Sequence, residues 1–224
     1  MEMFNQSRLE NHYRNILEQN REAILRGGVG DDYLKFPGRD TRMALALVIR
    51  ISPNVCSLIE AYLHKLKTIE PDLYYYPARD LHITVLDLLR GVPDRTIPDN
   101  IDDYTRCIRE CAKKISPFEI VFDGLTMSDN AVMIKGYYES ALEDFRQELR
   151  RSMKRYGLLL EERYETFSAH ITAARIPDQL RHPESFVTYL ADKHPFGEMK
   201  VTAFELVFHN WYDSQKKVLA KILL

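Results

Sequence analysis

The chain has 224 residues, of which 45% are hydrophobic and 29% charged, so it can bury a core and is not disordered by composition. Its formal net charge of -2 argues against a protein that binds long duplex nucleic acid through the phosphate backbone. No signal peptide is recognisable, and no apolar run reaches the ~20 residues that span a bilayer. The three cysteines form no Cys-x-x-Cys pair. We therefore expect a cytoplasmic monomer without a membrane partner.

The first 40 residues are predicted to form a helical extension to the rest of the chain. Apolar side chains recur at helical spacing from residue 5 to residue 26, and Gly27 and Gly28 follow as a stop signal. A phosphate-binding loop needs its amides at a helix N-terminus. These glycines follow a helix, so the sequence argues against a P-loop.

Beyond the extension, the chain runs twice through a similar order of elements, which indicates an architectural duplication. The first stretch is predicted to contain strands at 43–51 and 81–89, helices at 53–66 and 101–116, and a hairpin at 118–135. The second is predicted to contain a helix at 140–157, a strand at 167–176, a short helix at 183–192 and a hairpin at 201–223. Ser52 is a predicted N-cap, and Ser140 with Glu143 a predicted capping box.

Two of the predicted strands carry the same tripeptide, His82-Ile83-Thr84 and His170-Ile171-Thr172. Because side chains alternate across a strand, each histidine shares a face with its threonine, and their apolar neighbours point the other way. A polar face of this kind is costly in a core and useful in a cleft. A single such histidine is usually structural. Two at corresponding points of similar halves predict a shared cleft.

Paired histidines suit phosphoester chemistry without a metal or other cofactor. One neutral imidazole can take a proton from the attacking hydroxyl or water while one imidazolium protonates the leaving oxygen, and an ordinary pKa of ~6.5 lets both forms coexist. The hydroxyls of Thr84 and Thr172 can donate to the non-bridging phosphate oxygens. The predicted catalytic residues are therefore His82, Thr84, His170 and Thr172. No metal-ligand spacing accompanies them.

The two motifs with their apolar neighbours, Leu81–Val85 and Ala169–Ala173, resemble those of the 2H phosphoesterase superfamily, which includes 2′-5′ RNA ligase-like proteins and cyclic nucleotide phosphodiesterases. The likeness covers roughly residues 42–224. It implies that residues 41–224 form one bilobal α/β domain of α+β type, a duplicated fold with two antiparallel sheets and flanking helices around a central cleft. It also implies hydrolysis of 2′,3′-cyclic phosphates or cleavage of 2′-5′ linkages in small nucleotides or RNA ends, with no cofactor.

Other residues near the motifs are weaker candidates. Tyr76, Arg79, Arg42 and Tyr212 are predicted to contact the substrate, Tyr76 together with Tyr74 and Tyr75 as a stacking platform. Arg175 lies on the face opposite His170 unless its strand bulges. Trp211 is expected to pack, and Asp80 is expected to be exposed at the strand start or to orient His82.

A basic run on the helix at 140–157 is expected to face solvent, with RNA binding as the alternative. It comprises Arg146, Arg150, Arg151, Lys154 and Arg155. Five further histidines are expected at the surface or in the core: His12, His64, His182, His194 and His209.

Two functions compete on this fold. The first is a metal-independent phosphoesterase that uses both histidines. The second is a non-catalytic module that binds a nucleotide or an RNA end and needs neither acid nor base. The presence of all four motif residues favours the enzyme. An ATP-dependent ligase has no support from a nucleotidyl-lysine or P-loop motif.

Overall fold

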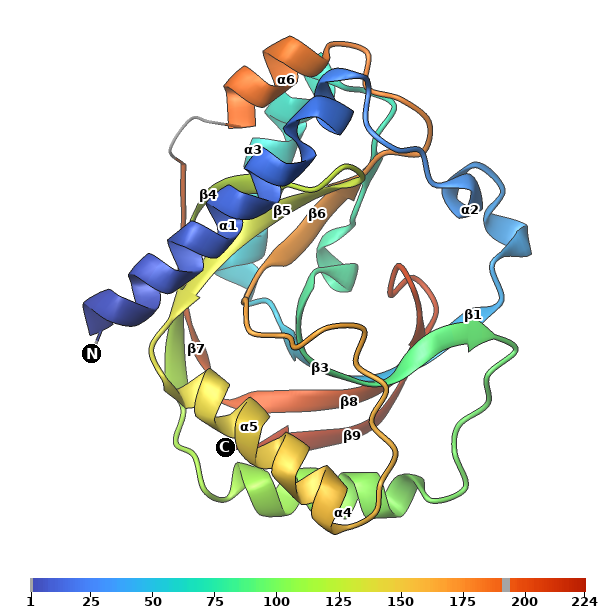
Figure 1. The fold of residues 1–224 in the computed structure, drawn as a ribbon, viewed down its shortest axis with the longest axis vertical. Helices are drawn as coiled ribbons and strands as arrows, with labels where there is room; N and C mark the ends of the chain where they lie inside the picture. Colours follow the sequence, from blue (N-terminus) through green and yellow to red (C-terminus); the bar gives the residue numbers. More distant parts are fainter. Residues whose placement is uncertain (1, 191–193) are drawn as a thin grey trace.

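Two antiparallel sheets form the centre of the computed structural model, which describes residues 2–190 and 194–224 (Figure 1). The first sheet has the order β3-β1-β8-β9, with β1 (Arg42–Arg50), β3 (His82–Pro93), β8 (Ala203–Asn210) and β9 (Lys216–Leu223). The second has the order β2-β6-β5-β4-β7, with β2 (Tyr74–Tyr75), β4 (Phe118–Met127), β5 (Ala131–Tyr138), β6 (Ile171–Arg175) and β7 (Pro195–Val201). The predicted fold class, two antiparallel sheets with flanking helices, is confirmed.

The two sheets are not built from successive halves of the chain. The β4–β5 hairpin follows the first motif in sequence, yet it lies in the sheet of the second motif. The C-terminal hairpin β8–β9 lies instead beside β1, in the sheet of the first motif. Each sheet therefore contains one motif strand together with a hairpin from the other half of the chain. The sequence also did not predict β7, which pairs with β4.

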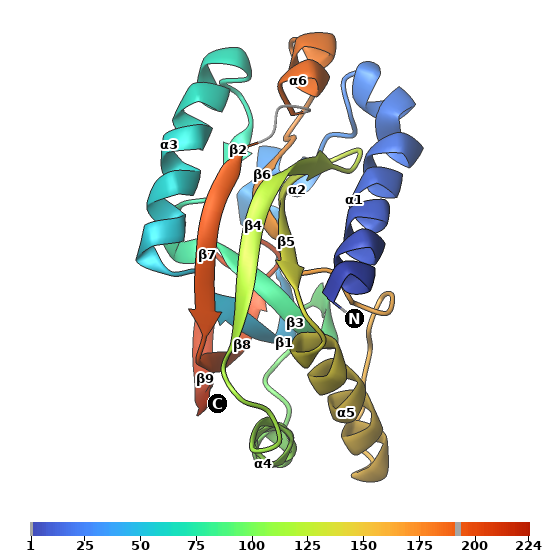
Figure 2. The same ribbon diagram turned by 90° about the vertical axis from the view of Figure 1, so that its left-hand side faces the viewer.

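Six α-helices flank the sheets in the described ranges: α1 (Glu2–Leu25), α2 (Asp32–Lys35), α3 (Pro53–Ile69), α4 (Ile101–Ala112), α5 (Ala141–Arg155) and α6 (Pro183–Leu190). Helix α1 packs against β4 and β5, α3 against β7, and α4 against α5 and β9 (Figure 2). Ser52 and Ser140 occupy N-cap positions, but neither side chain makes a capping hydrogen bond, so the predicted capping box is wrong. The predicted last residues of α6, 191 and 192, lie outside the described ranges. Within those ranges, no helix combines the length and apolar character needed to cross a membrane.

The N-terminal helix is fixed to the second sheet through Tyr13. This side chain is buried, and its hydroxyl donates to the carbonyl of Gly136 at 2.9 Å. The same oxygen accepts from the backbone amides of Gly136 and Ala169, both at 3.2 Å. Gly136 is required here, because a Cβ at this position would lie 2.1 Å from the carbonyl oxygen of Ala169. The extension thus supplies one hydrogen bond to the residue before His170.

Substituting Tyr13 by phenylalanine is expected to lower the free energy of unfolding by about 1–3 kcal/mol, because two buried amides lose their acceptor. Urea unfolding of the full chain measures this change. Tyr156→Phe is the matched control, since that side chain is exposed, and its effect should stay within about 0.5 kcal/mol. Equal stabilities of the Tyr13 and Tyr156 variants would contradict the anchoring role.

Candidate functional site

Both His-x-Thr segments line one small cavity between the two sheets. It has a volume of about 120 Å³, and its lining includes His82 and Thr84 of β3 together with His170 and Thr172 at β6. In both segments the burial alternates as the sequence predicted, with each histidine and threonine partly accessible and Ile83 and Ile171 buried. The fold therefore brings together four side chains that the sequence separates by more than 80 residues.

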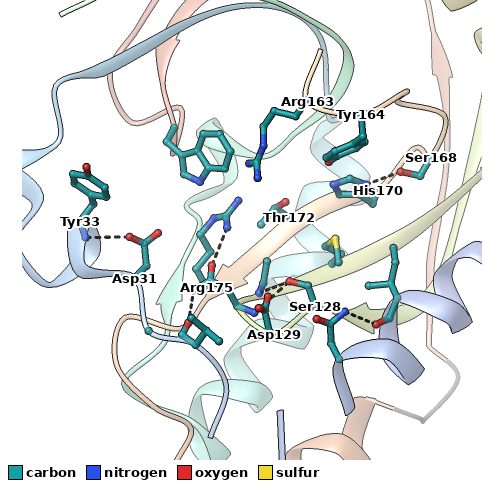
Figure 3. Close-up of a pocket in the computed structure, with 18 of the residues that line it drawn as sticks. Asp31, Tyr33, Ser128, Asp129, Arg163, Tyr164, Ser168, His170, Thr172 and Arg175 are labelled. Atoms are coloured by element: carbon teal, nitrogen blue, oxygen red, sulfur yellow. Dashed lines mark hydrogen bonds between the residues drawn. The ribbon is translucent and has the colours of Figure 1, made fainter. Parts of the chain in front are cut away.

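A second, larger cavity of about 790 Å³ adjoins the small one (Figure 3). Six residues line both cavities: Arg163, Tyr164, His170, Thr172, Arg175 and Trp211. The opposite wall of the larger cavity comes from the N-terminal extension, through His12, Asn20, Asp31 and Tyr33. Because they share these lining residues, the two cavities form one continuous space.

His82 is held by a backbone carbonyl. Its Nδ1 lies 2.8 Å from the carbonyl oxygen of Asp80, which can only accept, so Nδ1 carries a hydrogen and Nε2 is left to exchange protons with a ligand. The carboxylate of Asp213 lies 3.9 Å from the same nitrogen. Burial lowers the pKa of His82 to about 4, and the charge of Asp213 is the strongest influence that opposes this shift.

Asp213 is the centre of a buried charge network beside His82 that the sequence did not predict. Its carboxylate accepts from His209 Nδ1 at 2.8 Å and from Lys216 Nζ at 2.9 Å, and it also pairs with Arg50. Burial alone would favour the neutral acid, but the hydrogen bond from His209 and the charges of His82 and Arg50 hold the pKa of Asp213 well below its usual range. In the sequence, Asp213 stands out only as a residue inside the predicted hairpin at 201–223. Three or more side chains placed to hold a metal ion are not found among the described residues.

Asp80 belongs to the same network and is buried, so the expected exposed carboxylate is wrong. Its side chain accepts from Lys216 Nζ at 2.6 Å, and its carbonyl oxygen takes the hydrogen bond from His82. The orientation of the first histidine is therefore set by the backbone of Asp80, which the side-chain pattern of a sequence cannot reveal.

His170 has a different environment. Its Nδ1 lies 2.8 Å from the hydroxyl oxygen of Ser168, which can donate or accept (Figure 3). Burial lowers the pKa of His170 to about 4, and the positive charge of Arg146 is the next strongest influence in the same direction. The strongest influences on His170 therefore all favour its neutral form, whereas at His82 the charge of Asp213 favours the protonated form.

Arg146 of α5 is fully buried behind both motifs, so its predicted place on a solvated face is wrong. Its guanidinium donates to the carbonyl oxygens of Thr84 and Val85 on β3, at 2.8 and 2.7 Å. It also donates to those of Phe167 and Ser168, at 2.7 and 2.8 Å. The described residues offer it no carboxylate within ion-pair distance. One cation thus ties the two motif segments together.

Arg146 and Tyr13 also explain why β6 begins at Ile171, although the sequence predicted a strand from residue 167. The carbonyls at positions 167 and 168 bond to the guanidinium, and the amide at 169 bonds to the tyrosine hydroxyl. Just before His170, the backbone groups of residues 167–169 therefore bond to side chains and not to a neighbouring strand.

Arg175 reaches the cavity because β6 bulges. Thr172 and Ala174 pair with the consecutive residues Met133 and Val132 of β5, so Ala173 is an extra residue on β6. The bulge turns Arg175 to the side of His170 and Thr172, where it lines both cavities. Its Nε donates to the Tyr76 hydroxyl at 2.9 Å, which places that predicted residue beside the site.

The remaining predicted contacts divide into three kinds. Arg42 lines the larger cavity, but its guanidinium is paired with Asp40, with contacts of 2.7 and 2.9 Å. Tyr212 is buried and donates to Asp31 at 2.8 Å, so it holds the extension in place. Arg79 is 81% exposed and lines neither cavity, so the structure does not bring it to the site.

The tyrosine triplet does not form an open stacking platform. Tyr76 is buried, and Tyr74 packs on the rings of Tyr76 and Tyr212 at centroid distances of 5.1 and 5.8 Å. The hydroxyl of Tyr75 donates to the carbonyl of Glu70 at 2.7 Å. Accessible aromatic surface comes instead from Trp211 and Tyr164, which line both cavities, and from Tyr33 in the larger one.

Solved structures share this fold at low sequence identity. TT0787 of Thermus thermophilus aligns with a TM-score of 0.61 at 18% identity, over 81% of this chain and 97% of that chain. LigT of E. coli in its apo form aligns with a TM-score of 0.55 at 16% identity, over 82% and 98%. LigT in complex with 3′-AMP gives the same TM-score over the same shares. The curated proteins include no sequence that matches this chain.

The sequence model of the 2′-5′ RNA ligase superfamily matches residues 56–211, which is more than half of the chain. The matched span contains both His-x-Thr segments, Arg146, Arg163 and Arg175, and it leaves the N-terminal extension outside. The match confirms the resemblance drawn from the paired motifs. The chain belongs to the 2′-5′ RNA ligase superfamily.

Proposed function

We propose that the protein is a metal-independent phosphoesterase that acts on 2′,3′-cyclic phosphates or 2′-5′-linked nucleotides and RNA ends by two-histidine acid–base catalysis. The observation that carries the proposal is the shared cavity, in which two imidazoles and two threonine hydroxyls surround a space of about 120 Å³. A phosphoryl group placed there meets a proton donor, a proton acceptor and two hydroxyl donors. The membership in the 2′-5′ RNA ligase superfamily supports this reading.

We assign the acid to His82 and the base to His170. The Asp80 carbonyl and the Asp213 carboxylate both stabilise a protonated His82, which can then protonate the leaving oxygen through Nε2. Among the described residues, no carboxylate lies within ion-pair distance of His170, and the charge of Arg146 favours its neutral form, which can take the proton of the nucleophile. The threonines would donate hydrogen bonds to the non-bridging oxygens as charge develops.

The size of the site supports a nucleotide as substrate. The small cavity has room for a phosphate, and the adjoining 790 Å³ lies in the range of pockets that enclose nucleotide-sized ligands. LigT of E. coli, which shares the fold, has been crystallised with 3′-AMP, phosphate, ATP and NADP+. The identity of 16–17% carries only the fold, so the chemistry must be tested on this chain.

A substrate panel tests the proposal directly. The full chain, with EDTA present, is incubated with a nucleoside 2′,3′-cyclic phosphate and with a 2′-5′-linked dinucleotide, and the products are separated by anion-exchange chromatography. We expect turnover of at least one substrate and its loss in the His82→Ala/His170→Ala double variant. Equal rates for wild type and double variant on every substrate would overturn catalysis at this site.

The competing function is a non-catalytic module that binds a nucleotide or RNA end, and the large cavity would serve it equally well. Calorimetric titration with a 3′-nucleotide separates the two. Binding by the wild type without turnover of any cyclic or 2′-5′ substrate, and unchanged in either single histidine variant, would favour the module. Binding accompanied by turnover favours the enzyme.

A further inference from the structure

We infer that Arg163 and Arg175 form a second phosphate-binding subsite beside the His-x-Thr cavity, so that the preferred substrate is an oligonucleotide end and not a nucleoside cyclic phosphate. The inference rests on the proposed function. Both arginines line the small cavity and the large one, and their side chains reach into the same region, next to Thr172 (Figure 3). A phosphate held there would lie beside the phosphate held by the motifs.

The two guanidinium groups are positioned around one aromatic ring. The Cζ atoms of Arg163 and Arg175 lie 5.2 and 5.6 Å from the ring centroid of Trp211. Arg175 is also fixed by its hydrogen bonds to the Tyr76 hydroxyl at 2.9 Å and the Asn130 side-chain oxygen at 3.0 Å. These contacts use Nε and Nη1, and Nη2 makes no hydrogen bond to the described residues. The guanidinium of Arg175 is therefore held in a fixed position, and its Nη2 can still donate hydrogen bonds to a ligand.

Neither arginine is held in an ion pair with the described residues, although the charge of Arg163 acts on Asp87, which lines the small cavity. Among the described residues, no carboxylate forms an ion pair with Arg163 or Arg175, whereas Arg42, the third arginine near Trp211, is paired with Asp40. Asp31, Asp32 and Asp129 also line the large cavity. Asp31 accepts from the Tyr33 amide and the Tyr212 hydroxyl, and it lies on the wall formed by the extension (Figure 3). The unpaired positive charge is therefore located next to the catalytic cavity.

The sizes of the two cavities indicate which part of a substrate would meet the two arginines. The small cavity of about 120 Å³ accommodates little beyond the reacting phosphate, so the rest of the substrate must extend into the space of about 790 Å³. A second phosphodiester of an oligonucleotide would enter that space past Arg163, Arg175 and Trp211. A nucleoside cyclic phosphate has no second phosphate and leaves both cations unused.

The test compares adenosine 2′,3′-cyclic phosphate with the dinucleotide ApA that ends in a 2′,3′-cyclic phosphate. Wild type is expected to have the higher kcat/KM on the dinucleotide. Arg163→Gln and Arg175→Gln should each lower kcat/KM on the dinucleotide about tenfold, mainly through KM, and change it less than about threefold on the mononucleotide. The advantage of the dinucleotide should shrink as salt concentration rises. Arg109→Gln, on the exposed side of α4, is the matched control and should leave both substrates unchanged.

Equal losses on the two substrates would overturn the subsite, because the arginines would then act on the reacting phosphate or on folding. No loss on either substrate would overturn it as well. A failure of the proposed function gives a different result, namely no turnover by wild type. In that case calorimetric titration with ApA carrying a 3′-phosphate and with 3′-AMP still measures the subsite, which predicts tighter binding of the dinucleotide and loss of that difference in both arginine variants.

Discussion

Alanine in place of His82 or His170 is expected to lower kcat on a 2′,3′-cyclic phosphate by about 10²–10⁴, since a positioned acid or base contributes this much to proton transfer. Both imidazoles line the cavity with Thr84 and Thr172, and each is held through Nδ1. Steady-state kinetics with circular dichroism as a check on folding measures the effect. Less than a tenfold loss in a folded variant would contradict an acid–base role for that histidine.

The pH profile of the same variants distinguishes the acid from the base. In the proposed roles, His170 is a base that must be neutral, so the rate should fall as the pH drops through its pKa. His82 is an acid that must be protonated, so the rate should fall as the pH rises through its pKa. Burial lowers both values to about 4, so kcat/KM should be bell-shaped with an optimum below pH 6.5. His170→Ala should lose the acidic limb and His82→Ala the alkaline limb. The reverse pattern would exchange the two roles.

Asp213→Asn tests whether the Asp213 carboxylate acts through His82, and it leaves both histidines unsubstituted. The carboxylate raises the pKa of His82, so its removal should move the alkaline limb to lower pH and leave the acidic limb in place. A merely structural role would lower the rate at all pH values without moving a limb. Glu119→Gln, an exposed substitution on β4, is the control and should leave the profile unchanged.

Substituting Arg146 by methionine is expected to lower the free energy of unfolding by about 3 kcal/mol, because four buried carbonyl oxygens lose a charged donor and only part of that loss is offset by removing a buried cation. Urea unfolding measures the change. Arg151→Met on the same helix is the matched control; its side chain is 62% exposed and pairs with Glu148, so the loss should stay below about 1 kcal/mol.

The same Arg146 variant should also change catalysis. The guanidinium charge lowers the pKa of His170, so without it the acidic limb of the kcat/KM profile should move to higher pH. The kcat should fall too, because the guanidinium bonds both motif segments and fixes their separation. A variant with wild-type stability and an unmoved acidic limb would contradict both roles.

Much of the local structure could be predicted because it depends on local patterns. Apolar spacing identified α1, α3, α4 and α5, and most strands were placed within a few residues. The two His-x-Thr tripeptides predicted a shared cavity, because alternation along a strand decides which side chains share a face. The fold class followed from the family that these tripeptides resemble. These features depend on residues that are close together in the sequence, so they can be predicted without the tertiary structure.

The tertiary structure decided which distant groups complete the site. Arg146 was expected on a solvated face, yet it is buried, where it donates to two carbonyls of the edge strand β3 and to two carbonyls ahead of β6. The bulge at Ala173 brought Arg175 into the cavity against strand parity, and Asp213 reached His82 through a turn far along the chain. Alternation along a strand predicted the paired histidines. Their pKa values, their orientation and the space around them depend on contacts between segments remote in sequence, which only the packed structure defines.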